Sequence, residues 1–192
     1  MESDTFYHYY NRANNRENLF REEANYIYFL YLLKRHITPV ADVYSYCLLP
    51  NHFHLIIKTK ETAELPEETQ NGKKKISQSF SNLFNAYAKG YNQRYERRGS
   101  LFQKHPKHKE VTTTRYLQQL ILYVNTNSAH HNLADYDLYP HSSYSILITS
   151  GRTSLKRTEV LDLFDGLENF EEALKNKNQL IELNQSLLLE ED

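Results

Sequence analysis

Several features are scarce or missing in this 192-residue chain, and each absence excludes a class of protein or site. There is one cysteine, Cys47, so an internal disulfide framework and a multi-cysteine zinc site are both excluded. No apolar run approaches the ~20 residues of a membrane-spanning helix, and the opening residues MESDTFYHYYN lack the pattern of a secretory signal. A phosphate-binding G-x-x-x-x-G-K-[ST] loop is missing, so ATP-driven chemistry has no support. We therefore expect a cytoplasmic location and no membrane partner.

The charge is unevenly divided, although 23 Lys and Arg nearly balance 24 Asp and Glu overall. Residues 1–130 carry 18 basic and 12 acidic side chains, whereas residues 131–192 carry 5 and 12. The densest basic segment, residues 69–115, holds 11 basic and 2 acidic residues with aromatic residues between them. This composition suits phosphate contacts with base stacking, and the alternative is a solvated helix face with a basic loop. Contacts to nucleic acid are expected from Lys73, Lys74, Lys75, Lys89, Arg94, Arg97, Arg98 and Lys104.

Hydrophobic periodicity predicts a mixed fold in the first 130 residues. The order is strand, helix, strand, strand, helix, strand, helix, which predicts an α+β, ferredoxin-like sandwich. We expect a mostly antiparallel sheet with helices on one face. The 40% hydrophobic content is enough for a core at this length. The expected strands are Thr5–Tyr10, Asp42–Leu48, His52–Thr59 and a stretch around Leu101–Val111, and the expected helices are Glu22–Arg35, Ile76–Tyr95 and Thr112–Ser128.

The sequence changes character after Pro140. Leu155–Phe164 and Leu167–Leu189 have the pattern of acidic helices, with Gly166 between them. We therefore divide the chain into a main domain at residues 1–150 and an acidic helical C-terminal extension at residues 151–192. One hypothesis for the extension is a lid that competes with nucleic acid for the basic segment, and truncation after about residue 150 would then tighten binding at low salt.

Two histidines are placed to share one ligand. His52 and His54 stand at i and i+2 of a predicted strand, so their side chains project from one face while Phe53 projects from the other. Imidazoles about 7 Å apart at Cα can bind one metal ion. The alternative is a polar sheet face, but the flanking CLLPN and LIIKTK indicate a strand that enters the core, where buried imidazoles need partners.

A second pair lies on the predicted helix that follows the basic segment. Tyr123 and Asn127 are four residues apart, so they share a helix face. A tyrosine can act as a covalent nucleophile, and an asparagine carbonyl oxygen can bind a hard cation. Taken alone, Tyr123 is better explained as a core residue than as a nucleophile, since the chain has 16 tyrosines.

Three segments together resemble the HUH-type single-tyrosine transposases, and within that family the REP-associated tyrosine transposases. They are YSYCLLPNHFHLIIKTK, FSNLFNAYAKGYNQRYERRGSLFQKHPKHKEV and RYLQQLILYVNTN. The resemblance covers roughly residues 5–148, and its most specific parts are CLLPNHFHL, GSLFQ and the downstream tyrosine. Such enzymes cut single-stranded DNA near a folded hairpin. A helix tyrosine attacks the scissile phosphate, which leaves a 5′-phosphotyrosine and a 3′-OH, and the reverse step joins strands.

The resemblance implies roles for particular residues. Tyr123 matches the nucleophile, with Tyr116 as the backup, and His52, His54 and Asn127 match the ligands of a divalent ion, Mg²⁺ or Mn²⁺. It also implies single-stranded or hairpin DNA as the partner. Branches of the family include dimers and monomers, so a homodimer is one of two expected states.

The chain departs from the family pattern at three places. Ser128 replaces the proline that usually follows the metal-site asparagine, which would let the helix continue. Asn125 stands where many members have histidine, and His141-Ser142-Ser143-Tyr144 replaces Trp-Ser-Ser-Tyr. Two alternatives stay open. The basic segment and Ser128 leave room for a nucleic-acid-binding module that has lost catalysis, and the imidazole pair leaves room for a hydrolase with a zinc-bound water on the two histidines. His130 and His131, after the expected helix end, are interpreted as complements to the helix dipole.

Overall fold

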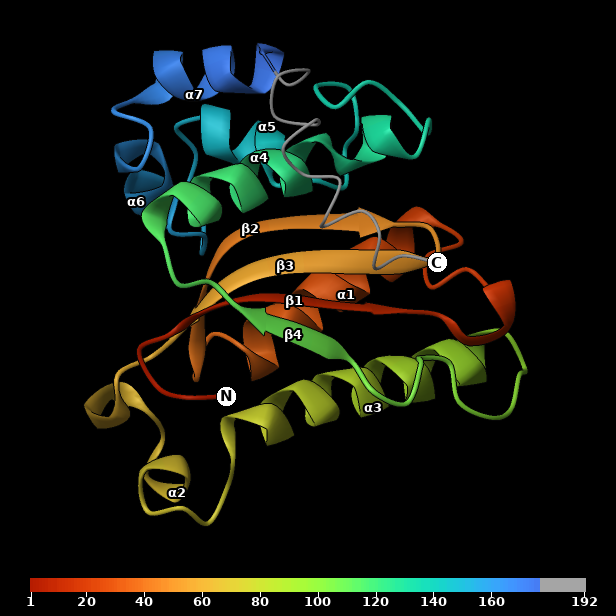
Figure 1. Ribbon diagram of the computed structural model, residues 1–192. Helices are drawn as coiled ribbons and strands as arrows, with labels where there is room; N and C mark the ends of the chain where they lie inside the picture. Colours follow the sequence, from red (N-terminus) through yellow and green to blue (C-terminus); the bar gives the residue numbers. More distant parts are fainter. Residues whose placement is uncertain (177–192) are drawn as a thin grey trace.

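The computed structural model describes residues 1–176, which form one antiparallel sheet with helices around it (Figure 1). The strand order is β2-β3-β1-β4, and all neighbouring strands run antiparallel. The predicted α+β class and antiparallel sheet are confirmed. The strands are β1 (Phe6–Arg12), β2 (Ala41–Leu49), β3 (His52–Thr59) and β4 (Lys107–Glu110). The helices are α1 (Glu23–His36), α2 (Glu67–Gln70), α3 (Ile76–Arg94), α4 (Thr114–His130), α5 (Tyr144–Ile148), α6 (Arg157–Asp162) and α7 (Leu167–Lys175), with 3-10 turns at Asn14–Arg16 and Thr62–Glu64.

The helices cover both faces of the sheet, so the expectation of helices on one face is wrong. Figure 1 shows α1 and α3 on one side and α4 on the other, with α5, α6 and α7 on the same side as α4. The physical reason lies in β2, which is buried at eight of its nine positions. A strand whose alternating side chains are buried on both sides needs cover on both faces.

The α1 and α3 face is packed with aromatic side chains. Phe53 of β3 is fully buried there, with its ring centroid 5.1 Å from that of Phe29 on α1. The hydroxyl of Tyr87 on α3 donates to the carbonyl oxygen of Leu19 at 2.6 Å. The two helices approach closely at Gly90, where a Cβ atom would lie 2.9 Å from the ring of Tyr28. This face is an ordinary core in which buried polar groups are bonded.

A buried polar network joins α4 to β2 on the other face. A β-bulge between Val43 and Ser45 shifts the β2–β3 register. Beyond it, the Asn125 side-chain amide donates to the Ser45 hydroxyl at 2.9 Å, and the Ser143 hydroxyl donates to Asn125 Oδ1 at 2.8 Å. Asn125, one of the departures from the family pattern, thus fixes α4 against the sheet and against the start of α5.

Helix α4 begins where expected and ends later. The Thr113 hydroxyl caps it by accepting the Tyr116 N–H at 3.2 Å. The helix then runs past Ser128 to His130, because serine retains the backbone N–H and lacks the ring with which proline breaks a helix. The additional residues place His130 and His131 over the end of the sheet at which β3 begins.

The segment after residue 150 packs on the same core as α4. Leu155 bridges to Val43 of β2, and Val160, Phe170 and Leu174 are buried. The short helix α5 is not anticipated by the sequence patterns. The expected helix Leu167–Leu189 begins as α7, and its part from residue 177 onward lies outside the described residues. The division at residue 150 stays a prediction. Within residues 1–176, no helix is both long enough and apolar enough to cross a membrane.

Candidate functional site

Polar side chains from β3, β1 and β4 gather on the face of the sheet that α4 covers. In the strand registers, Tyr10 lies opposite both His54 and Lys107, and His8 lies opposite Lys109. Directly opposed residues project from the same face of a sheet, so these groups are neighbours. Their position is set by the strand order and not by closeness in sequence. We call His8, Tyr10, Arg12, His52, His54, Lys107 and Lys109 the polar strip.

Helix α4 places the predicted nucleophile and ligands over this strip. The Tyr123 ring centroid lies 5.7 Å from that of His54 and 6.4 Å from that of His8. One end of the helix is fixed at His131, whose ring centroid is 4.7 Å from that of His52. Tyr123, Asn127 and His131 are spaced four residues apart and therefore share one face of α4. Asn127 lies between the other two along the helix, so it faces His52 and His54. The structure thus brings together the four residues expected at the site.

The imidazoles of the strip are neutral. Burial lowers the pKa of His8 to about 3, helped by the charge of Lys109. Burial also lowers the pKa of His52 to about 3, with smaller contributions from His131 and Arg12, and lowers that of His54 well below its usual value. A neutral imidazole retains a lone pair on one nitrogen, so each of these rings can bind a metal ion.

Buried polar atoms without hydrogen-bond partners mark the place where an ion fits. Within residues 1–176, His52 Nε2 and both side-chain polar atoms of Asn127 have no hydrogen-bond partner. Leaving such an atom unsatisfied costs about 1–3 kcal/mol, so it needs an explanation in a native structure. His52 Nδ1 donates to Asn51 Oδ1 at 2.6 Å, which fixes the tautomer that leaves the lone pair on Nε2. The donors therefore fit a divalent ion bound by His52, His54 and Asn127.

All three candidate ligands are uncharged. In the described part of the chain, no group of three or more His, Cys, Asp or Glu side chains is placed to hold a metal ion. The candidate third donor is the Asn127 amide oxygen, and the zinc-hydrolase alternative has no third ligand of those four types within residues 1–176. Two imidazoles with one oxygen suit Mn²⁺ better than Mg²⁺, which prefers oxygen ligands and water.

The backup nucleophile Tyr116 lies nearer the start of α4. It precedes Tyr123 by seven residues, or about 10 Å along the helix axis. The ammonium of Lys109 is 5.8 Å from its ring centroid. Tyr116 therefore lies at the β4 side of the strip, whereas Tyr123 contacts the imidazoles.

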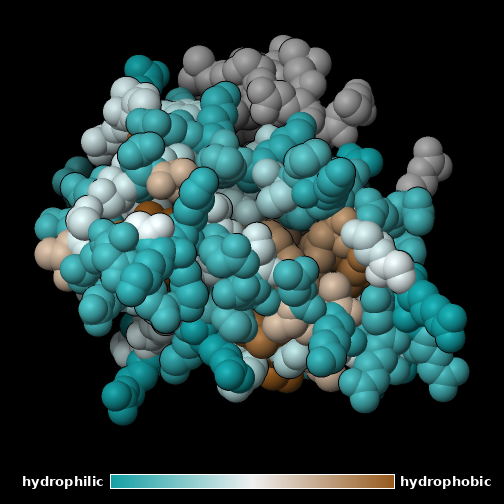
Figure 2. Space-filling view, turned by 90° about the horizontal axis from the view of Figure 1, so that it is seen from below, coloured by the Kyte–Doolittle hydropathy of each residue, from teal (hydrophilic) through white to brown (hydrophobic). Residues whose placement is uncertain are grey.

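The predicted DNA-binding cations lie mainly along α3, on the opposite face of the sheet from the strip. Arg94 is paired with Glu22, Arg97 with Glu17 at 2.7 Å, and Lys74 with Glu68. Figure 2, viewed from the side on which α3 lies, shows a mostly hydrophilic surface with smaller hydrophobic areas. Lys73, Lys75, Lys89, Arg98 and Lys104 complete the predicted set. The structure thus separates the cations of residues 73–98 from the strip, and several of them have carboxylate partners. Lys104 is the exception, because it follows Gln103, whose backbone N–H donates to the carbonyl oxygen of Arg12 at 2.9 Å.

Several residues of the site are not indicated by local sequence patterns. His8, Lys107 and Lys109 reach it through the β3-β1-β4 order, which no local pattern reveals. His130 and His131 were interpreted as dipole complements, but the ring centroid of His130 lies 5.6 Å from that of Tyr123. The spacing of four residues from Tyr123 to Asn127 to His131 was a signal that could have identified His131.

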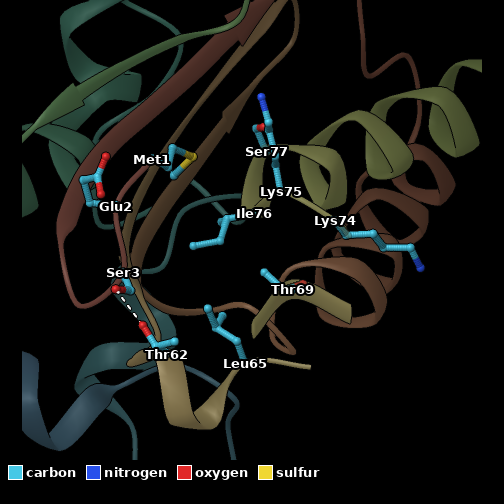
Figure 3. Close-up of a pocket in the computed structure, with 10 residues that line it drawn as sticks. All are labelled: Met1, Glu2, Ser3, Thr62, Leu65, Thr69, Lys74, Lys75, Ile76 and Ser77. Carbon is cyan, nitrogen blue, oxygen red and sulfur yellow. Dashed lines mark hydrogen bonds between the residues drawn. The ribbon is translucent and has the colours of Figure 1, made fainter. Parts of the chain in front are cut away.

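A separate pocket of about 250 Å³ lies near the start of α3 (Figure 3). It is formed where the N-terminal residues before β1 meet the segment that follows β3. Figure 3 shows the hydrogen bond between Thr62 and Ser3, which is 3.1 Å long. The lining residues are Met1, Glu2, Ser3, Thr62, Leu65, Thr69, Lys74, Lys75, Ile76 and Ser77. None of them belongs to the polar strip, so the pocket and the candidate site are distinct.

Comparison with known proteins shows a similarity of fold. No protein-family model and no curated protein matches the chain. A solved structure of a REP-associated tyrosine transposase bound to a REP hairpin matches 78% of this chain and 82% of its own, with a TM-score of 0.61 and 14% sequence identity. The similarity extends over most of both chains, although few residues are identical. The chain therefore has the fold of a REP-associated tyrosine transposase.

Proposed function

We propose that this protein cleaves single-stranded DNA and transfers the strand, with Tyr123 as the nucleophile and a divalent ion at His52, His54 and Asn127. The observation that carries the proposal is the convergence of a buried phenol with two neutral imidazoles and an amide that has no hydrogen-bond partner among residues 1–176. The fold similarity supports it, since the matching transposase was solved bound to a REP hairpin. A hairpin with a single-stranded flank is therefore the proposed substrate.

The chemistry assigned to Tyr123 is an in-line displacement at phosphorus. Its oxygen forms a new bond to the scissile phosphate while the bond to the 3′ oxygen breaks, which leaves a 5′-phosphotyrosine and a 3′-OH. The phenol loses its proton to solvent, and the leaving 3′ oxygen takes one up, so the exchange is balanced. When bound, Mg²⁺ or Mn²⁺ supplies positive charge that polarises the phosphate and favours the phenolate of a group that ordinarily ionises near pH ~10.

Four other residues of the strip hold the substrate in this scheme. Lys107 and Lys109 are exposed on the edge strand β4, and Arg12 is exposed at the end of β1. They lie beside the imidazoles, where phosphates adjoining the scissile bond would pass. Tyr10, which stacks on His8 with centroids 4.7 Å apart, offers an aromatic surface to a base. The strip thus combines charge and stacking at one place.

Covalent trapping tests the proposal. The protein is mixed with labelled hairpin DNA from its own genomic flanks and Mn²⁺, and the products are separated under denaturing conditions. We expect a labelled protein band that disappears with EDTA and in Tyr123→Phe. Tyr31→Phe is the matched control, because Tyr31 is 55% exposed on α1, away from the strip, and this variant should keep the band.

Two outcomes would overturn the assignment in different ways. A covalent band that persists in Tyr123→Phe and disappears in Tyr116→Phe would move the nucleophile to Tyr116. Binding of the hairpin that is unaffected by EDTA, with no adduct and no cleaved product, would instead support a binding module that has lost catalysis.

A further inference from the structure

One buried histidine of the strip has no part in the mechanism above. His8 lies in the middle of β1 and is 6% exposed, and its partner His54 is 2% exposed. His8 Nε2 is 2.9 Å from His54 Nδ1, a hydrogen-bond distance between two ring nitrogens. The ring planes differ by 22° and the centroids are 5.1 Å apart, so the rings meet edge to edge through these nitrogens.

This contact determines what His54 can bind. A neutral imidazole carries one proton, so one nitrogen donates and the other holds a lone pair. If His54 Nδ1 carries the proton, His54 Nε2 keeps its lone pair and can bind a cation. If His8 Nε2 donates instead, the proton of His54 resides on Nε2 and blocks coordination there. The direction of one hydrogen bond therefore decides whether His54 is a ligand.

We infer that His8 is a positioning residue, whose Nε2 accepts a hydrogen bond from His54 Nδ1 and so fixes the tautomer that presents His54 Nε2 to the divalent ion. The inference rests on the proposed metal site. Metal-binding histidines usually donate their second N–H to a carboxylate, a carbonyl or water. At His52 an amide oxygen, Asn51 Oδ1, has this role. At His54 the acceptor is a second imidazole, which adds no charge.

The packing around His8 holds its ring in place for this task. Tyr10 stacks on it at 4.7 Å with planes 28° apart, and Tyr123 meets it edge-on at 6.4 Å. On the neighbouring strand, Lys109 lies directly opposite His8. These contacts come from β1, β4 and α4, so the His8 ring is restrained from three elements at once.

The direct test reads the tautomer of His54 by long-range ¹H–¹⁵N correlation in metal-free, DNA-free protein. We expect the proton on Nδ1. A proton on Nε2 would overturn the inference, whatever the activity of the enzyme. Because neither metal nor DNA is present, this result is independent of whether the protein cleaves anything.

Two variants of His8 add a binding measurement. In His8→Phe the ring remains but the acceptor is lost, and we expect Mn²⁺ affinity, measured by electron paramagnetic resonance with DNA bound, to fall about 10- to 100-fold. In His8→Gln the side-chain oxygen restores an acceptor, and the affinity should stay within about threefold of the wild type. Equal losses in both variants would overturn the role of the hydrogen bond. His108→Phe, on β4 and facing the other side of the sheet, is the matched control and should leave the affinity unchanged.

These readouts separate this inference from the proposed function. A wild-type protein with the Nδ1–H tautomer that binds no Mn²⁺, with or without DNA, would overturn the metal site and with it the task of His8. A wild-type protein that binds Mn²⁺ and shows the Nε2–H tautomer would overturn the role of His8 alone. Cooperative urea unfolding of both variants, with midpoints lowered by no more than the loss of one buried hydrogen bond, shows that the fold is retained.

Discussion

The two faces of the sheet are both buried, but they are filled in different ways. On the α1 and α3 face, Phe53 packs against Phe29, and the hydroxyl of Tyr87 has a carbonyl acceptor. On the α4 face, the residues on either side of Phe53 are His52 and His54, and the Asn127 amide has no hydrogen-bond partner within residues 1–176. Burying polar atoms in this way opposes folding, so the α4 face is less stable than an apolar face would be, at the residues for which we propose a catalytic role.

The largest expected effect compares neighbours on one strand. Phe53→Ala opens a cavity in the packed face, and we expect the free energy of unfolding to fall by about 3–5 kcal/mol. His52→Phe, one residue earlier, should change it by about 1 kcal/mol or less while removing the response to Mn²⁺. Urea unfolding at pH 7 measures the first effect, and the trapping reaction measures the second. Similar losses of stability in the two variants would contradict the division between the faces.

Much of this difference between the two faces of the sheet could be predicted from the sequence, because it follows from local periodicity. The alternation in His52–Thr59 assigns His52 and His54 to one face and Phe53 to the other, and the helix expected at Ile76–Tyr95 is α3 to within one residue. The helices on both faces were not predicted. The alternation of residues along a strand shows which side chains share a face, but it does not show what covers each face. The near-continuous apolar run of β2 was the signal for burial on both sides.

The residues of the candidate site also fall into two groups, those that the sequence could link and those that only the fold brings together. Tyr123 and Asn127, like the two histidines, are linked by spacing within one element, so the sequence could group them. His8, Lys107 and Lys109 join them through the order of strands in the sheet, which depends on tertiary packing. His131 depends on where α4 ends, and Ser128 in place of the family's proline moves that end.

The second effect is a pH dependence of stability that arises from a buried histidine on the α4 face. Burial holds the pKa of His8 at about 3, below the value near 6.5 expected in the unfolded chain. Between these values the unfolded state binds a proton that the folded state does not, so stability is complete above pH ~6.5 and falls as the pH is lowered. For one such imidazole the loss from pH 7 to pH 5 is on the order of 2 kcal/mol.

Unfolding of metal-free protein at the two pH values tests this effect. Other groups titrate in the same range, so the informative quantity is the difference between the wild type and His8→Phe. The variant should lose less stability on acidification, by about the contribution of one imidazole. Identical pH dependence in the wild type and His8→Phe would contradict the burial of a neutral His8.

The third effect comes from a variant that makes the α4 face more like the apolar α1 and α3 face. Asn127→Leu replaces an amide that has no hydrogen-bond partner in the described residues with an apolar side chain of similar size. We expect the metal-free protein to gain about 1–2 kcal/mol of stability, because the buried amide no longer opposes folding. The same variant should form no DNA adduct. A destabilised Asn127→Leu would show that Asn127 is bonded in the native protein and is not held for a ligand.

The fourth effect is a coupling between metal binding and DNA binding, which follows from the lack of charge on the three candidate ligands. With two imidazoles and an amide, a divalent ion gains no anionic partner from the protein, so a substrate phosphate should supply it. We expect Mn²⁺ to bind at least about 10-fold more tightly when single-stranded DNA is bound, and DNA to bind more tightly by the same factor when Mn²⁺ is present. Titrations in both directions measure the coupling. A methylphosphonate at the cleaved step should abolish the coupling, and strong Mn²⁺ binding without DNA would contradict it.

The smallest effect concerns the cations on the two faces. Lys107 and Lys109 lie on the strip, whereas Lys73 and Lys75 precede α3 on the far side of the sheet. For a short single strand that spans the cleaved step, the Lys107→Gln/Lys109→Gln variant should weaken binding and reduce the slope of log affinity against log salt by about 0.7 for each phosphate that is no longer neutralised. The matched Lys73→Gln/Lys75→Gln variant removes the same charge and should leave this strand's affinity unchanged. If the two variants weaken binding equally, the strand follows the basic segment around α3, as the charge distribution of the sequence first suggested, and the polar strip does not guide it.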